Sequence, residues 1–333
     1  MQEPKAAFFC NRPDLANRVF PDSRIARLKK HADVHPVMID KKNFEAQLPE
    51  LADCEYIFST WGMLVLKPAQ IQKLPSLKMV FYGAGTVKYF AEPFLQQNIR
   101  IVSAWAANAV PVAEFTVAQM TLAAKGYFGL SRKLMAEGAA AWKPTKATGN
   151  YDIEVSILGA GMVGREVIQR LAYHDINILV FDPYLSALEA EKLGVTLVSL
   201  EQAFARGYVV SNHLANVPET ENILQSSHFA SMPVGGTFIN TGRGATVDEP
   251  AMIEILRQRS DITALLDVAQ QEPVAEDSPL YQLQNVWLSP HIAGSMGREV
   301  VRMADFVLDE FERTLNGEAL HFEVTLEQLP TMA

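Results

Sequence analysis

The sequence predicts an α/β protein built from two doubly wound parallel-sheet domains. Short apolar runs alternate with helical patterns in two series along the 333 residues, and a long helical pattern lies between the two series. A glycine-rich turn follows the first strand of the second series. With 49% hydrophobic and 20% charged residues, the composition is that of an ordinary globular protein, which argues against a disordered or fibrous chain.

The first series occupies about the first hundred residues. Four apolar runs are expected to be strands, namely 6–10, 56–59, 79–82 and 99–102. Helical patterns fall between them at 14–30, 44–51, 67–74 and 87–97. Helices that alternate with parallel strands cover both faces of a sheet, so this part of the chain predicts a small doubly wound domain.

The second series follows a long, small-residue-rich helical pattern at 108–133. Six strands are expected, at 153–158, 178–181, 208–211, 237–240, 263–266 and 286–288. Six parallel strands suit a full Rossmann-type fold. A last amphipathic pattern, 298–315, is expected to pack back on the first domain.

A glycine turn joins the first strand of the second series to a helix. It reads Gly159-Ala160-Gly161-Met162-Val163-Gly164 and stands between the apolar strand and the helical pattern 165–173. In this motif the first glycine permits a tight turn, the second lets a pyrophosphate approach the backbone, and the third lets the helix pack closely on the sheet. Free N–H groups at the helix start, here at Met162 and Val163, favour the anion. Alone, such a pattern is weak evidence, because glycine turns also occur for structural reasons.

Asp182 strengthens the dinucleotide interpretation. It ends the next strand, where a carboxylate receives the adenosine ribose hydroxyls. Its charge would repel a 2′-phosphate, and residues 183–186 contain no Arg or Lys, so NAD is favoured over NADP as the cofactor. The alternative is that Asp182 merely caps the helix that begins near Ser186.

Three charged or titratable residues follow later strands of the same domain, where open α/β sheets place their ligand sites. Arg243 lies in a glycine-flanked loop after 237–240, Glu272 precedes a proline after 263–266, and His291 follows 286–288. An Arg in such a loop can hold a carboxylate through a bidentate pair. Singly, each has a plain structural alternative: a surface ion pair, a solvated carboxylate and a core histidine.

These residues, their order and the glycine turn resemble the D-2-hydroxyacid dehydrogenase family, D-isomer specific and NAD-dependent, over most of the chain. The resemblance implies an enzyme that transfers a hydride between NAD and a small 2-keto or 2-hydroxy acid. It implies that Arg243 orients the substrate carboxylate, that His291 exchanges the proton at the substrate oxygen and that Glu272 holds His291. Because a carboxylate stabilises an imidazolium, Glu272 should extend the pH range of reduction.

The resemblance also implies further contacts. In Gly83-Ala84-Gly85, the backbone around Ala84 and Gly85 would hold the substrate carboxylate, as an anion nest does. The residues placed beside the cofactor are Asn108, His213, Thr241 and, at the nicotinamide carboxamide, Asp267.

The sequence departs from the family pattern after Gly85. Thr86, Val87 and Lys88 stand where acidic or amide residues are usual, so the detail of the substrate loop is open. Trp61, after the second strand, is either a wall of the substrate pocket or a core residue, and burial statistics favour neither.

The resemblance implies a domain division. Residues 1–104 and 298–333 would form the smaller, flavodoxin-like substrate domain, and 105–297 the Rossmann-type NAD domain. The long helix from Asn108 and the segment 138–150 resemble the region through which family members form two-fold dimers, so a homodimer is expected.

The net charge and the composition near the start of the chain argue against some classes of binding partner and cellular location. The net charge of −9, without a dense basic run, argues against nucleic-acid and anionic-membrane partners. The two cysteines have no metal-ligand spacing, so no metal site is expected. The apolar run near the start is too short for a signal peptide, and a cytoplasmic location is expected. Two rival functions stay open: an NAD-sensing regulatory protein without catalysis, and an NADP-preferring glyoxylate or hydroxypyruvate reductase.

Overall fold

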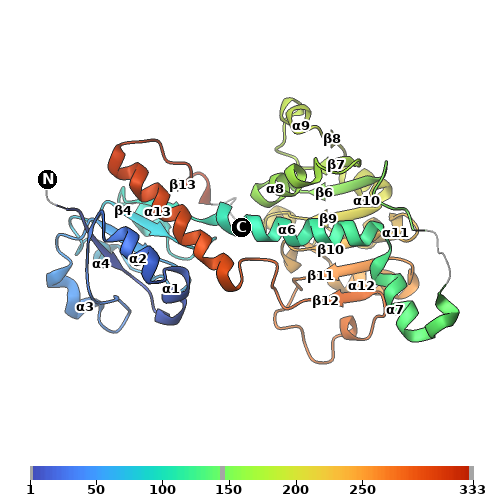
Figure 1. Cartoon of the computed structure of the whole chain (residues 1–333), viewed down its shortest axis with the longest axis horizontal. Coiled ribbons are helices and arrows are strands. Elements are labelled where there is room, and N and C mark those ends of the chain that lie inside the picture. The colour runs from blue at the N-terminus through green and yellow to red at the C-terminus, as the bar shows by residue number, and fades with distance from the viewer. Residues whose placement is uncertain (1–2, 143–146, 330–333) are drawn as a thin grey trace. The chain divides into compact units, whose positions relative to one another are not determined.

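The computed structural model describes residues 3–142 and 147–329 and divides the chain into two compact units (Figure 1). Unit 1 contains Met1–Asn108 and Ser295–Ala333, and unit 2 is Ala109–Gly294. The predicted boundaries, 104/105 and 297/298, fall within a few residues of this division. Unit 2 is thus inserted into unit 1.

Unit 1 is built on a six-stranded sheet in the order β13-β5-β4-β3-β1-β2. Its strands are β1 (Lys5–Phe8), β2 (Asp33–Val34), β3 (Tyr56–Ser59), β4 (Met79–Tyr82), β5 (Arg100–Ser103) and β13 (Glu323–Val324). Its helices are α1 (Pro13–Val19), α2 (Asp22–Leu28), α3 (Phe44–Gln47), α4 (Pro68–Ile71), α5 (Glu92–Leu95) and α13 (Val300–Asn316), and α6 (Trp105–Ala124) begins in this unit. All strand pairs are parallel except β13 with β5, which is antiparallel.

α13 packs on this sheet, as its amphipathic pattern predicted. Met303, Val307 and Phe311 are fully buried in the core of unit 1. The ring of Phe311 meets those of Phe58 and Phe81 edge-on, with centroids 5.3 and 5.4 Å apart, while Phe58 and Phe81 stack at 5.0 Å. The last helix of the chain therefore completes the core of its first hundred residues.

Unit 2 is a seven-stranded parallel sheet in the order β12-β11-β10-β9-β6-β7-β8. Its strands are β6 (Glu154–Leu158), β7 (Asn177–Phe181), β8 (Thr196–Leu197), β9 (Val209–Asn212), β10 (Thr237–Asn240), β11 (Thr263–Leu266) and β12 (Val286–Leu288). Its helices are the rest of α6, α7 (Tyr127–Glu137), α8 (Met162–Leu171), α9 (Ala187–Leu193), α10 (Leu200–Arg206), α11 (Ser226–Ser231) and α12 (Glu249–Gln258).

The strand order of unit 2 reverses at β6. The chain runs from β6 to β7 on one side and from β9 to β12 on the other, so the carboxyl end of β6 is a topological switch point. Open α/β sheets bind ligands in the crevice outside their strand ends at this point. The glycine turn begins there, directly after Leu158.

Several predicted helices were wrong in extent, and the pattern 67–74 is helical only in α4 (Pro68–Ile71). The pattern 14–30 is two helices, because Pro21 disfavours helical geometry in the residue before it, and Phe20 accordingly has φ −111° and ψ 75°. The pattern 108–133 breaks at Gly126, which has φ +66°. The pattern 87–97 is helical only in α5, and Val87, ahead of it, lies buried in the core.

Candidate functional site

The glycine turn of unit 2 needs glycine at its first and third positions. Gly159 has φ +89°, and a Cβ there would stand 2.8 Å from the carbonyl oxygen of His213. A Cβ on Gly164 would stand 2.0 Å from the carbonyl oxygen of Gly159, far inside contact distance. The start of α8 therefore lies directly against the end of β6, with no room for a side chain.

Gly161 differs, because a Cβ on it would meet no atom within 4 Å. It forms the N-cap of α8, and the amides of Met162 and Val163 have no acceptor among the described residues. Open space above a run of free N–H groups fits a pyrophosphate. The turn thus has the features that a dinucleotide requires.

Asp182 lies beside this turn. One oxygen of its carboxylate accepts from the amide of Ala160 at 2.6 Å, and the other accepts from the amide of Tyr184 at 2.8 Å. The cap of α9 is Ser186, whose hydroxyl accepts from the amide of Glu189, so Asp182 is not the helix cap that the alternative interpretation required. Arg165 lies close by, but its guanidinium is bound to Ala160 O and to Glu189.

A cluster of polar side chains surrounds His213, whose backbone lies against Gly159 of the turn. Thr241 Oγ1 is 3.0 Å from Thr116 Oγ1 and 3.5 Å from His213 Nδ1, and Ser211 Oγ is 2.9 Å from His213 Nε2. Burial of the ring lowers the pKa of His213 to about 3, so the ring is neutral at physiological pH. The sequence analysis missed Thr116 and Ser211, since neither stands in a motif.

Glu272 and His291 form a direct pair. Glu272 Oε2 lies 2.7 Å from His291 Nδ1, and Glu272 Oε1 accepts from the amide of Ala269 at 3.3 Å. His291 Nε2 has no partner within residues 3–142 and 147–329, and the side chain is 52% exposed. The pair therefore presents one ring nitrogen to a ligand while the carboxylate holds the other.

Arg243 lies close enough to Glu272 for the two charges to interact. Partial burial lowers the pKa of the Arg243 guanidinium, and the Glu272 carboxylate opposes that shift. Arg243 Nη1 donates to Gly242 O at 2.8 Å. Unit 2 thus brings together the three residues that the sequence singled out, at loops after β10, β11 and β12.

Asp267 holds the loop that carries His291. Its carboxylate is 2% exposed and accepts from Ser289 Oγ and from the amides of Ile292 and Ala293, at 2.9 and 2.8 Å. His291 itself has φ +54°, and its amide donates to the carbonyl oxygen of Asp267. Sequence reasoning missed Ser289 and this anchoring role, and the predicted contact of Asp267 with the carboxamide stays a prediction.

The Gly83–Gly85 loop of unit 1 is tied down through its carbonyl groups. Thr60 Oγ1 donates to Gly83 O at 2.8 Å, and Ser103 Oγ donates to Ala84 O at 3.0 Å. The amide of Ala84 donates to the carbonyl oxygen of Tyr82. The amide of Gly85 has no acceptor in the described part of the chain. Gly85, with open space around its Cα, is thus the better placed of the two for a carboxylate.

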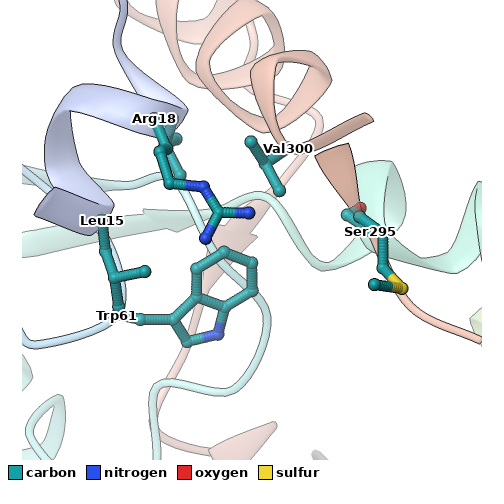
Figure 2. Close-up of a pocket in the computed structure, with 7 residues that line it drawn as sticks. Leu15, Arg18, Trp61, Ser295 and Val300 are labelled. Carbon is teal, nitrogen blue, oxygen red and sulfur yellow. The ribbon is translucent and has the colours of Figure 1, made fainter. Parts of the chain in front are cut away.

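Thr86, Val87 and Lys88, which depart from the family pattern, differ in burial. Val87 is fully buried and anchors the loop to the core, while Thr86 and Lys88 are exposed. Trp61 is half-buried and lines a pocket of unit 1 (Figure 2), so its ring packs partly on the core and is partly accessible to a ligand.

Asn108 Oδ1 accepts from the amide of Ser295 at 3.0 Å. Asn108 therefore binds together the two points where the chain leaves and re-enters unit 1.

Residues 3–142 and 147–329 contain neither a metal-binding cluster nor a membrane-spanning helix. No group of three or more His, Cys, Asp or Glu side chains there is arranged to hold a metal ion. None of the helices described is long and apolar enough to span a membrane.

Comparison with known proteins places the chain among dehydrogenases. Residues 117–293, just over half of the chain, match the model of the D-isomer specific 2-hydroxyacid dehydrogenase, NAD binding domain. A D-3-phosphoglycerate dehydrogenase of Archaeoglobus fulgidus is 30% identical over 265 residues, which are 78% of this chain and 49% of that protein. The chain spans about half the length of the curated relatives that it matches.

Solved structures share the fold. A phosphoglycerate oxidoreductase from Rhizobium etli has a TM-score of 0.82 at 22% identity, over 98% of this chain and all of that one. A probable 2-hydroxyacid dehydrogenase from Rhizobium etli CFN 42, in complex with NADP, HEPES and L(+)-tartaric acid, has a TM-score of 0.74 at 21% identity, over 99% of this chain. At these identities the likeness concerns the fold alone.

Proposed function

The chain belongs to the D-isomer specific 2-hydroxyacid dehydrogenase family, and from this membership we propose that it transfers a hydride between NAD and a small 2-keto or 2-hydroxy acid of D configuration. The observation that carries the proposal is the Glu272–His291 contact of 2.7 Å. These residues lie in the unit that matches the NAD binding domain.

His291, Glu272 and Arg243 have separate roles in the proposed reduction of a 2-keto acid. NADH supplies a hydride to the 2-keto carbon when it is bound. Negative charge then grows on the substrate oxygen, and His291 Nε2, which has no partner in the described structure, delivers a proton to that oxygen. Glu272 stabilises the imidazolium and fixes the ring so that Nε2 faces the ligand. Arg243 holds the substrate carboxylate.

Steady-state assays with NADH and NADPH across a panel of 2-keto acids test this function. The panel includes pyruvate, glyoxylate, hydroxypyruvate and 3-phosphohydroxypyruvate, the last because the curated relatives are named for phosphoglycerate. We expect turnover of at least one member with NADH. Tight NADH binding without turnover would instead support a regulatory protein, and faster turnover with NADPH would support an NADP-preferring reductase.

Asp182 is proposed to set the preference for NAD. We expect the double variant Asp182→Ala/Tyr184→Arg to raise the NADPH to NADH ratio of kcat/KM by about tenfold or more, because it removes a repulsive carboxylate and adds a cation beside the 2′ position. Steady-state kinetics with both cofactors measure the ratio. Tyr184→Ala alone is the control, since Tyr184 is largely exposed and its amide contact with Asp182 remains. An unchanged ratio would refute the ribose assignment.

A homodimer is also proposed. None of the side chains of α7 is buried, and Tyr127, Met135 and the following Trp142 are 52%, 84% and 77% exposed. Large apolar side chains exposed along one segment are typical of an interaction surface. Residues 143–146 of the predicted dimer region lie outside the described residues.

Light scattering coupled to gel filtration tests the dimer. The wild-type chain is expected to show about twice its mass of 36.9 kDa. Tyr127→Glu/Met135→Glu is expected to shift the peak to the monomer, since it buries two charges in the interface. Val234→Glu, at a residue 82% exposed elsewhere in unit 2, is the control and should stay dimeric. A monomeric wild type would overturn the proposal.

The cytoplasmic location stays a prediction, in keeping with two buried free thiols at Cys10 and Cys54.

A further inference from the structure

Three buried polar side chains lie next to the loop of unit 2 that carries Arg243. Asn212 ends β9 and Asn240 ends β10, and the two residues are paired in register across these neighbouring strands. Thr246 lies three residues after Arg243. The exposed fractions of Asn212, Asn240 and Thr246 are 0%, 1% and 0%. Polar groups removed from water in this way need hydrogen-bond partners, so the partners of these side chains show what the side chains hold.

The amide of Asn212 joins the other two side chains. Asn212 Oδ1 accepts from the amide of Leu214 at 3.2 Å, and this backbone donor fixes which way the side-chain amide is turned. Asn212 Nδ2 therefore faces the other side. It donates one proton to Asn240 Oδ1 at 3.1 Å and the other to Thr246 Oγ1 at 2.8 Å.

The other ends of this network lie on the backbone at Arg243. Asn240 Oδ1 also accepts from the amide of Gly242 at 3.1 Å, and Asn240 Nδ2 donates to Arg243 O at 3.3 Å. Because Thr246 Oγ1 accepts from Nδ2 of Asn212, its own proton is free for Arg243 O, 2.9 Å away. A network whose members all have partners is rigid, so the peptide groups on both sides of the Gly242–Arg243 pair are held in place.

Close packing limits the Arg243 loop on two sides. A Cβ on Gly242 would stand 3.0 Å from the carbonyl oxygen of the last residue of β9, and one on Gly244 would stand 1.9 Å from the carbonyl oxygen of Ala269. The amide of Ala269 is the group that donates to Glu272 Oε1. The backbone at Arg243 is therefore held between β9 and the loop that carries Glu272.

The guanidinium of Arg243 has one nitrogen in use and one edge free. Nη1 donates to Gly242 O at 2.8 Å, whereas Nε and Nη2 have no partner within residues 3–142 and 147–329. An arginine binds a carboxylate through two parallel hydrogen bonds from such a planar edge. Because hydrogen bonds weaken steeply as they bend, this pair requires that the backbone hold the edge in one orientation.

We propose that Asn212, Asn240 and Thr246 are positioning residues for Arg243. Their hydrogen bonds fix the loop so that the free Nε–Nη2 edge is oriented for the carboxylate of a 2-keto acid. Since all three side chains are buried, they act through the backbone of Arg243. The inference rests on the role proposed for Arg243, and thus on the proposed dehydrogenase function.

Thr246→Val and Thr246→Ser test the inference as a matched pair. Valine has the shape of threonine without the hydroxyl, so Arg243 O loses a donor, whereas serine keeps the hydroxyl. We expect Thr246→Val to lower kcat/KM for the accepted 2-keto acid by about five- to tenfold, mainly through KM, and Thr246→Ser to stay within about twofold of wild type. NADH affinity, measured by fluorescence titration, should be unchanged in both. Thr246→Ala removes the same hydroxyl and takes the place of the valine variant if that variant does not fold.

The methyl ester of the same keto acid separates positioning from a general loss of structure. Arg243 forms its charge-assisted pair only with a carboxylate, so Thr246→Val should reduce the preference for the acid over the ester by about five- to tenfold. An equal fall for acid and ester would overturn the inference. In an Arg243→Gln background, Thr246→Val should have no further effect on kcat/KM, because both changes act on one interaction, and additive effects would also overturn it.

Thr237→Val is the control. Thr237 is a buried threonine at the first position of β10, at the opposite end of the strand from Asn240, and its replacement should change neither the acid-to-ester preference nor NADH affinity. If no keto acid is turned over, the dehydrogenase function fails, and calorimetric titration of the NADH-bound chain with the same acids still decides the inference. Weaker binding in Thr246→Val than in wild type and Thr246→Ser supports it, and equal or absent binding in all three chains overturns it.

Discussion

His291→Ala is expected to lower kcat for every accepted 2-keto acid by about 10²- to 10⁴-fold, the usual effect of losing a general acid. NADH affinity should remain within about twofold of wild type, because the role proposed for His291 Nε2 is at the substrate oxygen, and the one described side-chain partner of His291 is Glu272. Stopped-flow reduction and fluorescence titration with NADH measure the two quantities separately.

His321→Ala is the matched control for this variant. His321 is an exposed histidine of unit 1, and its removal should leave both quantities unchanged. If His291→Ala weakened NADH binding as much as turnover, the histidine would be a cofactor contact, and the proton would have to come from another group.

Gly164→Ala is expected to abolish NADH binding and to destabilise unit 2 by about 3 kcal/mol or more. The new methyl group would fall 2.0 Å from the carbonyl oxygen of Gly159, so either α8 or the end of β6 must move. Overpacking in a close-packed interior costs about 1–3 kcal/mol and more where backbone must shift. Urea unfolding followed by circular dichroism, with and without NADH, measures both effects.

Two alanine variants sharpen this test. Gly161→Ala meets no atom within 4 Å, so it should leave the apo protein as stable as wild type and weaken only NADH binding. Gly129→Ala, in the open on α7, should leave NADH binding unchanged and should not lower stability, because alanine is the better helix former. Equal loss of stability at Gly161 and Gly164 would contradict the distinct roles given to the two glycines.

The central strands were predictable because short apolar runs that alternate with helical patterns are typical of a buried parallel sheet. β3, β4, β10 and β11 have the predicted bounds. The short edge strands β2, β8 and β13 were missed, since two residues carry no periodicity that a pattern can register. The helix breaks at Pro21 and Gly126 were visible in principle, because both residue types interrupt helices, but apolar spacing continues across them.

The site was predictable where a residue type and its place after a strand both pointed to chemistry. Arg243, Glu272 and His291 are of this kind, and the structure brings them together. Asp267 shows the limit of such reasoning, because its hydrogen bonds to the loop at 292–293 depend on the left-handed backbone of His291.

The burial of Phe311 against Phe58 and Phe81 has a consequence for biosynthesis. Residues 1–108 leave the ribosome first, yet the helix that covers their aromatic cluster is made only after all of unit 2 has emerged. Domains fold as units during translation. Unit 2 can therefore fold while the N-terminal segment of the nascent chain still exposes the apolar face of its sheet. We expect that segment to bind chaperones during translation.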